Sequence, residues 1–88
     1  MRRKRRIVPA AMRKLARALR EEFDAEVEIE VSPGDAVTGD RFRFAVVSPR
    51  FRRIHHLKRQ DLIWDVVDKL LTREEAFSVL MILAYSPN

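Results

Sequence analysis

Apolar residues alternate with polar ones at two different periods along the chain, and each period predicts a different element. Over residues 10–24 they recur every three or four positions, which predicts an amphipathic helix behind Pro9, whose fixed φ suits a first helical position. Residues 26–31 and 42–47 alternate apolar with mostly polar side chains, so each predicts a half-buried strand. Turn residues fill the connection at 32–40 and favour an antiparallel hairpin.

The second half of the chain predicts one more helix and one more strand. An apolar stripe predicts a helix over about 59–71, with Trp64 off the main stripe and partly exposed. Residues 72–75 have the form of a capping box, so they either start one short helical turn or simply lead into the next strand. The continuous apolar run at 77–84 predicts a buried strand. The fold class is therefore α+β: a single small domain ordered helix, strand, strand, helix, strand, with a three-stranded mixed sheet covered by two helices.

The length of 88 residues suits one domain, which we place at residues 9–88 behind a flexible basic arm at residues 1–8. The chain has no cysteine, which excludes disulfides and thiol catalysis. The apolar stretch at 7–12 is too short for a signal peptide, and the longest apolar run is far below the roughly 20 residues of a membrane helix. We therefore expect a cytoplasmic protein with no membrane partner. Open strand edges leave the choice between a monomer and a weak dimer.

Charge comes in blocks, although the net charge is only +5. Residues 1–20 carry nine Lys or Arg and no acid, residues 21–40 carry eight acids and no base, and residues 41–60 carry seven Lys or Arg and no acid. Such segregation gives a folded surface patches of both signs, and positive patches attract phosphate polymers through counterion release. The alternative is that the blocks pair across the fold and merely solubilise it, and the pattern alone does not decide.

Residues 50–59, called the basic segment below, are the best functional candidate. They lie between a strand and a helix start, where backbone N–H groups can also hold phosphate. We predict nucleic-acid contacts from the charged side chains of this segment and of the arm: Arg50, Arg52, Arg53, His55, His56, Lys58 and Arg59, with Arg2, Arg3, Lys4, Arg5 and Arg6. A solubilising loop is the alternative. No catalytic or metal-ligand motif occurs, so we expect neither an enzyme nor a cofactor.

Three short segments resemble the BolA family. Residues 47–51 (VSPRF) resemble its V-S-D-x-F segment, and residues 57–63 (LKRQDLI) resemble its L-x-R-H-R-x-V helix start. Residues 78–82 (SVLMI), with Ser86-Pro87 after them, resemble its H-A-L-S-I strand followed by T-P. The resemblance spans roughly residues 10–87 and implies a fold similar to the type II KH domain.

The resemblance implies two roles. One is nucleic-acid binding as a transcriptional regulator, and the other is partnership with a monothiol glutaredoxin-like protein around a shared iron–sulfur cluster. The family's ligand histidines fall on Ser78 and Gln60, and the loop at 32–41 has neither His nor Cys, whereas cluster iron takes thiolate or imidazole ligands. We therefore predict a nucleic-acid-binding module, and keep a protein-interaction module with a glutaredoxin-like partner as the alternative.

Overall fold

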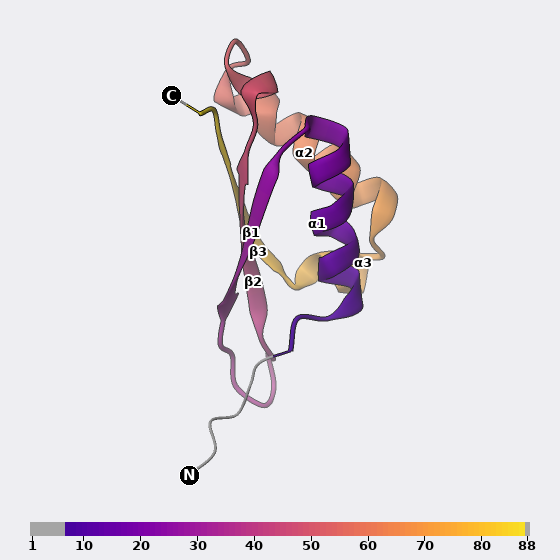
Figure 1. Cartoon of the computed structure of the whole chain (residues 1–88). Coiled ribbons are helices and arrows are strands. Elements are labelled where there is room, and N and C mark those ends of the chain that lie inside the picture. Colours follow the sequence, from indigo (N-terminus) through magenta and orange to yellow (C-terminus); the bar gives the residue numbers. More distant parts are fainter. Residues whose placement is uncertain (1–6, 88) are drawn as a thin grey trace.

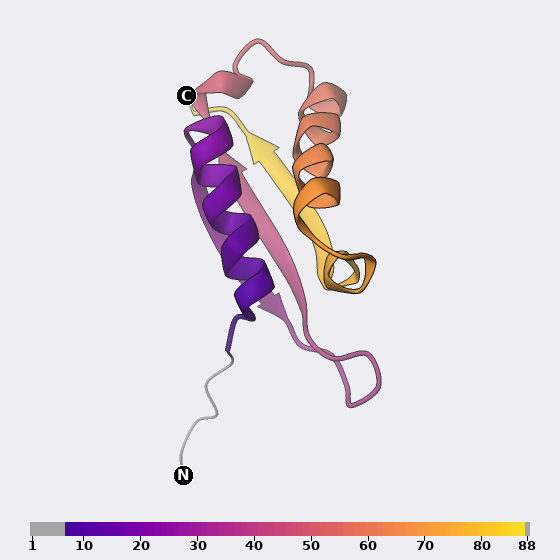
Figure 2. The same ribbon diagram turned by 90° about the vertical axis from the view of Figure 1, so that its right-hand side faces the viewer.

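The computed structural model describes residues 7–87. Its elements are α1 (Ala10–Phe23), β1 (Glu26–Ser32), β2 (Arg41–Val47), the 3-10 helix η1 (Pro49–Phe51), α2 (His56–Leu70), α3 (Arg73–Phe77) and β3 (Val79–Tyr85). The strands form one sheet in the order β1-β2-β3, antiparallel between β1 and β2 and parallel between β2 and β3. All three helices lie on one side of this sheet (Figure 1), and α1 and α2 lie next to each other on it (Figure 2).

The predicted α+β class, the element order and the mixed three-stranded sheet are confirmed, with η1 and α3 as additions. α2 begins at His56 rather than near residue 59, because the Nδ1 of His55 caps it by accepting the N–H of Leu57 at 3.3 Å. The capping box is also real: the Thr72 hydroxyl accepts the N–H of Glu75, whose carboxylate accepts the N–H of Thr72. The short helical turn was therefore the correct alternative.

The prediction of a buried strand over 77–84 is wrong in two respects. Phe77 closes α3, so the strand starts at Val79. β3 is also buried on one side only, since Val79 and Ile82 are buried while Met81 and Leu83 are 40% and 38% exposed. The apolar run is continuous although only one face of the strand meets the core.

The core lies between the sheet and the helices. Its largest fully buried apolar side chains come from both the helices and the sheet: Phe44, Phe51, Met12, Leu15, Leu19, Ile63, Val46 and Val67. α1 buries a wide stripe, whereas Ile63 and Val67 are the only buried residues of α2. α2 therefore packs on the sheet through a narrow contact and keeps its flanks accessible. No helix of residues 7–87 is long and apolar enough to cross a membrane.

Ser48 joins four elements at one end of the sheet. It is fully buried, and its hydroxyl donates a hydrogen bond to the carbonyl of Phe23 at the end of α1. The same oxygen accepts the N–H of Arg50 at 3.1 Å and so caps η1, while the N–H of Ser48 donates to the carbonyl of Tyr85 in β3 at 3.0 Å. η1 in turn presses the Phe51 ring against Phe23, with 5.2 Å between ring centroids.

Replacing Ser48 with alanine will lower the free energy of unfolding by about 1–3 kcal/mol, because it leaves the Phe23 carbonyl without its buried donor. Urea unfolding followed by circular dichroism measures the change. Ser86→Ala, near the chain end in a half-buried position, is the matched control and should shift stability by less than about 0.5 kcal/mol. Equal midpoints for the two variants would contradict the role given to Ser48.

Candidate nucleic-acid interface

The basic segment forms the connection from η1 into the first turn of α2. It follows Ser48, so it lies at the end of the sheet where β3 also finishes (Figure 1). Phe51 is buried and Ile54 half-buried against the core, and together they anchor a loop whose other side chains, apart from the half-buried Arg59, are exposed. The arm residues Arg2, Arg3, Lys4, Arg5 and Arg6 lie outside the described residues, so the arm stays a prediction.

Three cations of the basic segment are free to meet a ligand. Arg52, Arg53 and Lys58 are exposed, and within residues 7–87 their side chains form no hydrogen bond or ion pair. His56 is exposed as well and stacks on His55, with ring centroids 5.4 Å apart. These are the residues whose charge the fold itself does not use.

Three other predicted contacts hold the structure together. The Arg59 guanidinium donates from Nε to the carbonyl of Ile54 at 2.7 Å and from an Nη to that of Ala84 at 3.2 Å. It also lies over the Phe51 ring, 5.8 Å from its centroid. Arg50 donates to the carbonyl of Glu22 at 3.1 Å, and His55 is the cap of α2. Their phosphate contacts stay predictions, but each has a structural role that sequence reasoning missed.

The helix dipole adds to the positive charge of the basic segment. The first turn of α2 contains no acid, while Lys58 and Arg59 sit there. Cations at a helix N-terminus oppose the macrodipole, at a cost of about 0.3–1 kcal/mol each when exposed. The exposed charge of Lys58 therefore does not stabilise the helix, and a bound anion would offset its repulsion from the dipole.

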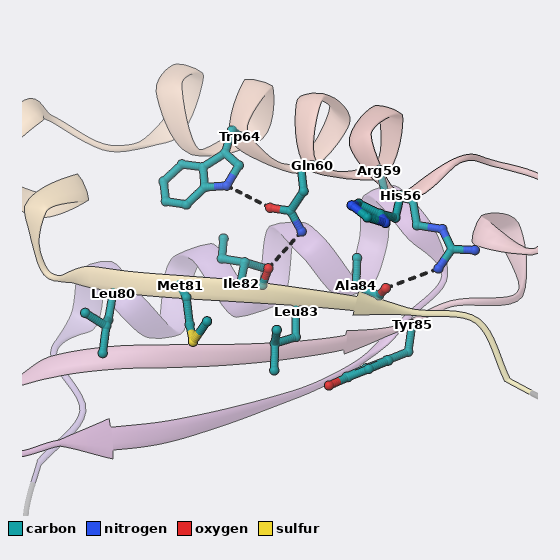
Figure 3. Close-up of a pocket in the computed structure, with 10 residues that line it drawn as sticks. All are labelled: His56, Arg59, Gln60, Trp64, Leu80, Met81, Ile82, Leu83, Ala84 and Tyr85. Atoms are coloured by element: carbon teal, nitrogen blue, oxygen red, sulfur yellow. Dashed lines mark hydrogen bonds between the residues drawn. The ribbon is translucent and has the colours of Figure 1, made fainter.

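A groove of about 680 Å³ runs between α2 and the free edge of β3, next to the basic segment. Figure 3 shows four side chains of α2 along it: His56, Arg59, Gln60 and Trp64. The amide of Gln60 donates to the carbonyl of Ile82 at 2.9 Å and accepts the indole N–H of Trp64 at 3.1 Å. These two hydrogen bonds hold the indole in the groove wall. Trp64 is half-buried there, which agrees with its predicted partial exposure. The hydrogen bond between Gln60 and Trp64 could have been predicted from the sequence, because residues four positions apart lie side by side on a helix.

The positions of the family's ligand histidines are occupied differently here. Gln60 is engaged in its two hydrogen bonds, and Ser78 ends α3, where its carbonyl accepts the N–H of Phe42 at 2.8 Å. No group of three or more His, Cys, Asp or Glu within residues 7–87 could hold a metal ion. The donors at these two positions are oxygen and amide groups, which do not suit iron in a cluster.

The loop between β1 and β2 closes on itself. Asp35 accepts the N–H groups of Thr38 and Val37 at 2.8 Å each. These hydrogen bonds, that of Thr38 first, hold the pKa of the Asp35 carboxyl below its ordinary value. Gly39 takes a positive φ of 69°, and a Cβ on Gly34 would lie 1.7 Å from the Gly39 carbonyl oxygen, so both glycines are required.

No family model matches the sequence, and no curated protein matches it significantly. Among solved structures, the chain is similar to the BolA domain of SufE1 from Arabidopsis thaliana, with a TM-score of 0.67 and 22% sequence identity. The match covers 92% of this chain and 96% of that one. The chain therefore has the fold of a BolA domain, which confirms the fold that the sequence resemblance implied.

Replacing Arg59 with alanine will lower the free energy of unfolding by about 1.5–3 kcal/mol, because two hydrogen bonds from a charged group are lost. Its neighbour Lys58 is the matched control, and Lys58→Ala should change stability by less than about 0.5 kcal/mol. Urea unfolding of both variants gives the comparison. If both variants are as stable as the parent, the structural role of Arg59 is wrong.

Proposed function

We propose that this BolA-like fold is a non-enzymatic nucleic-acid-binding module, in which the basic segment holds phosphates and the groove beside it takes bases. The observation that carries this proposal is the set of free cations Arg52, Arg53 and Lys58 at the positive end of α2, adjoining a groove with an indole in its wall. The basic segment supplies charge for the phosphates, and the groove supplies an aromatic surface for the bases.

The phosphate half rests on charge that is free and exposed. Because these cations are unpaired, a phosphate backbone would replace condensed counterions without breaking any bond of the protein. His56 and Arg59 belong to the basic segment and also line the groove, so a strand held at Lys58 has a continuous path into the groove. The first-turn N–H groups of α2 add donors on the same side.

The base half rests on Trp64. Stacking of a base on an aromatic ring contributes about 1–3 kcal/mol and accepts any base, because every base has a π face. A base reaches the indole only when it is unpaired, so the groove favours single strands. Transcriptional regulation, which the resemblance implies, needs duplex recognition, and the duplex arm of the binding experiment therefore decides that role.

A second candidate is a protein-interaction module with a glutaredoxin-like partner. It is supported by exposed apolar side chains around Ser78, with Phe77 65% and Leu80 37% exposed. Docking there would proceed without a shared cluster. Size-exclusion chromatography with a purified monothiol glutaredoxin tests it: a complex that Phe77→Ser dissolves would support this candidate, and separate elution would exclude it.

Charge reversal of Arg52 and Arg53 to Glu will weaken nucleic-acid binding by about tenfold or more and reduce the slope of log K against log salt by about 2. Fluorescence anisotropy with labelled single-stranded DNA, RNA and duplex DNA over a salt series gives both numbers. Charge reversal of Arg13 and Arg17, exposed on α1, is the matched control because it changes the net charge equally. Equal losses in the two variants would mean that net charge alone drives binding.

Emission of Trp64, the single tryptophan, will be quenched by single-stranded oligonucleotides and much less by duplex DNA. Stacking on the indole is the physical reason. Trp64→Ala should weaken single-strand binding by about tenfold, within the range of one stacking contact, and leave the salt slope unchanged. Binding without quenching would retain the basic segment as the site and remove the groove from it.

A further inference from the structure

The face of the sheet that points away from the helices is open. No other element of residues 7–87 covers it (Figure 1). Strand alternation turns every second side chain to this face, since the residues between them are packed against the helices. The strand register sets these side chains in three rows across β1, β2 and β3: Glu30, Arg43 and Met81; Glu28, Ala45 and Leu83; Glu26, Val47 and Tyr85.

The chemistry of the face changes from one edge to the other. On β1 every member is a glutamate, and on β3 the members are Met81, Leu83 and Tyr85, which are 40%, 38% and 48% exposed. Figure 3 shows these three pointing away from α2. The acidic column and the apolar column lie two strand spacings apart, about 10 Å. A band of exposed apolar side chains on one strand is typical of an interaction surface.

A hollow of about 420 Å³ lies over the middle row and extends to Glu30 and Arg43 of the neighbouring row. Ala45 forms its floor because its side chain is small, and Glu28 and Leu83 stand on either side. Glu30 is paired with Arg43 at 3.6 Å, whereas Glu28 has no ion-pair partner within residues 7–87. An apolar group could therefore fill the hollow while a neighbouring cation reaches the free carboxylate of Glu28.

We propose that this open face docks a partner protein through an amphipathic helix whose apolar stripe is bordered on one side by Lys or Arg. The apolar stripe lies on Leu83 and its column, with one side chain over Ala45. The long cationic side chains lay their stems across the hollow and bring their charged ends to the glutamates of β1. The match of both apolarity and charge specifies the orientation of the helix.

A second copy of this chain fits the face poorly. Stacking two such sheets with aligned strands places the glutamates of one copy over either the glutamates or the apolar column of the other. The first arrangement repels and the second buries unpaired carboxylates. A nucleic acid is also excluded, because the glutamates repel phosphate. The surface is thus distinct from the basic segment and suits a different class of partner.

A pair of synthetic helical peptides tests the proposal on the full chain. One carries a leucine stripe bordered on one side by lysines, and its twin has glutamates in place of the lysines. Isothermal titration should show binding of the lysine peptide at least about tenfold tighter than that of its twin. Titration of the ¹⁵N-labelled protein should shift the amides of residues 28, 45 and 83 together. Equal binding of the twins, absent binding, or shifts confined to other surfaces would overturn the proposal.

Two single substitutions on the open face locate the peptide-binding site. Glu28→Gln should remove most of the preference for the lysine peptide, and Leu83→Ser should weaken both peptides several-fold, whereas Glu74→Gln on α3 should change neither. Glu28→Gln should bind nucleic acid as the parent does, because Glu28 lies outside the groove and the basic segment, so failure of this proposal is separable from failure of the nucleic-acid function. Sedimentation of the protein alone completes the test: a dimer that Leu83→Ser dissociates would assign the face to a second copy and overturn the proposal.

Discussion

The hydrogen bond from the buried Ser48 hydroxyl to the Phe23 carbonyl fixes the end of the molecule on which the candidate interface is built. The bond connects the last turn of α1 to the end of β2, and the Ser48 N–H connects the same point to β3. Because the hydroxyl also caps η1, the chain turns sharply and delivers Phe51 to the core. The basic segment begins two residues after Ser48, so the hydrogen bonds of Ser48 fix the position of its charged side chains.

Long polar side chains join α2 to the free edge of β3, in addition to the core that the two elements share. Arg59 and Gln60 satisfy the outward carbonyls of Ala84 and Ile82 on the free strand edge. An edge strand with open hydrogen-bonding groups is a template for unwanted pairing, and these two side chains occupy it. They also line the groove between the helix and the strand, together with Trp64.

Periodicity carried most of the fold prediction and failed where tertiary partners decide. The stripe of α1 and the alternation of β1 and β2 each require burial on one side, so their patterns were sufficient. The apolar run of β3 has the same sequence pattern whether one or both of its faces are covered. Only the structure shows that no other part of residues 7–87 covers Leu83. The role of Arg59 was equally out of reach, because its acceptors are backbone atoms 5 and 25 positions away.

The charge blocks of the sequence are joined by little ion pairing within residues 7–87. Ion pairs within residues 7–87 are few: Arg43 with Glu30 joins two blocks, and Lys69 with Asp65 lies inside one. Among residues 7–87, ion pairing between blocks therefore neutralises few of the charges. Unpaired cations gather at the basic segment and unpaired glutamates on the open face of β1. The basic segment and the glutamates of β1 share no residue, and the two proposed surfaces meet only at β3, where Met81, Leu83 and Tyr85 also line the groove.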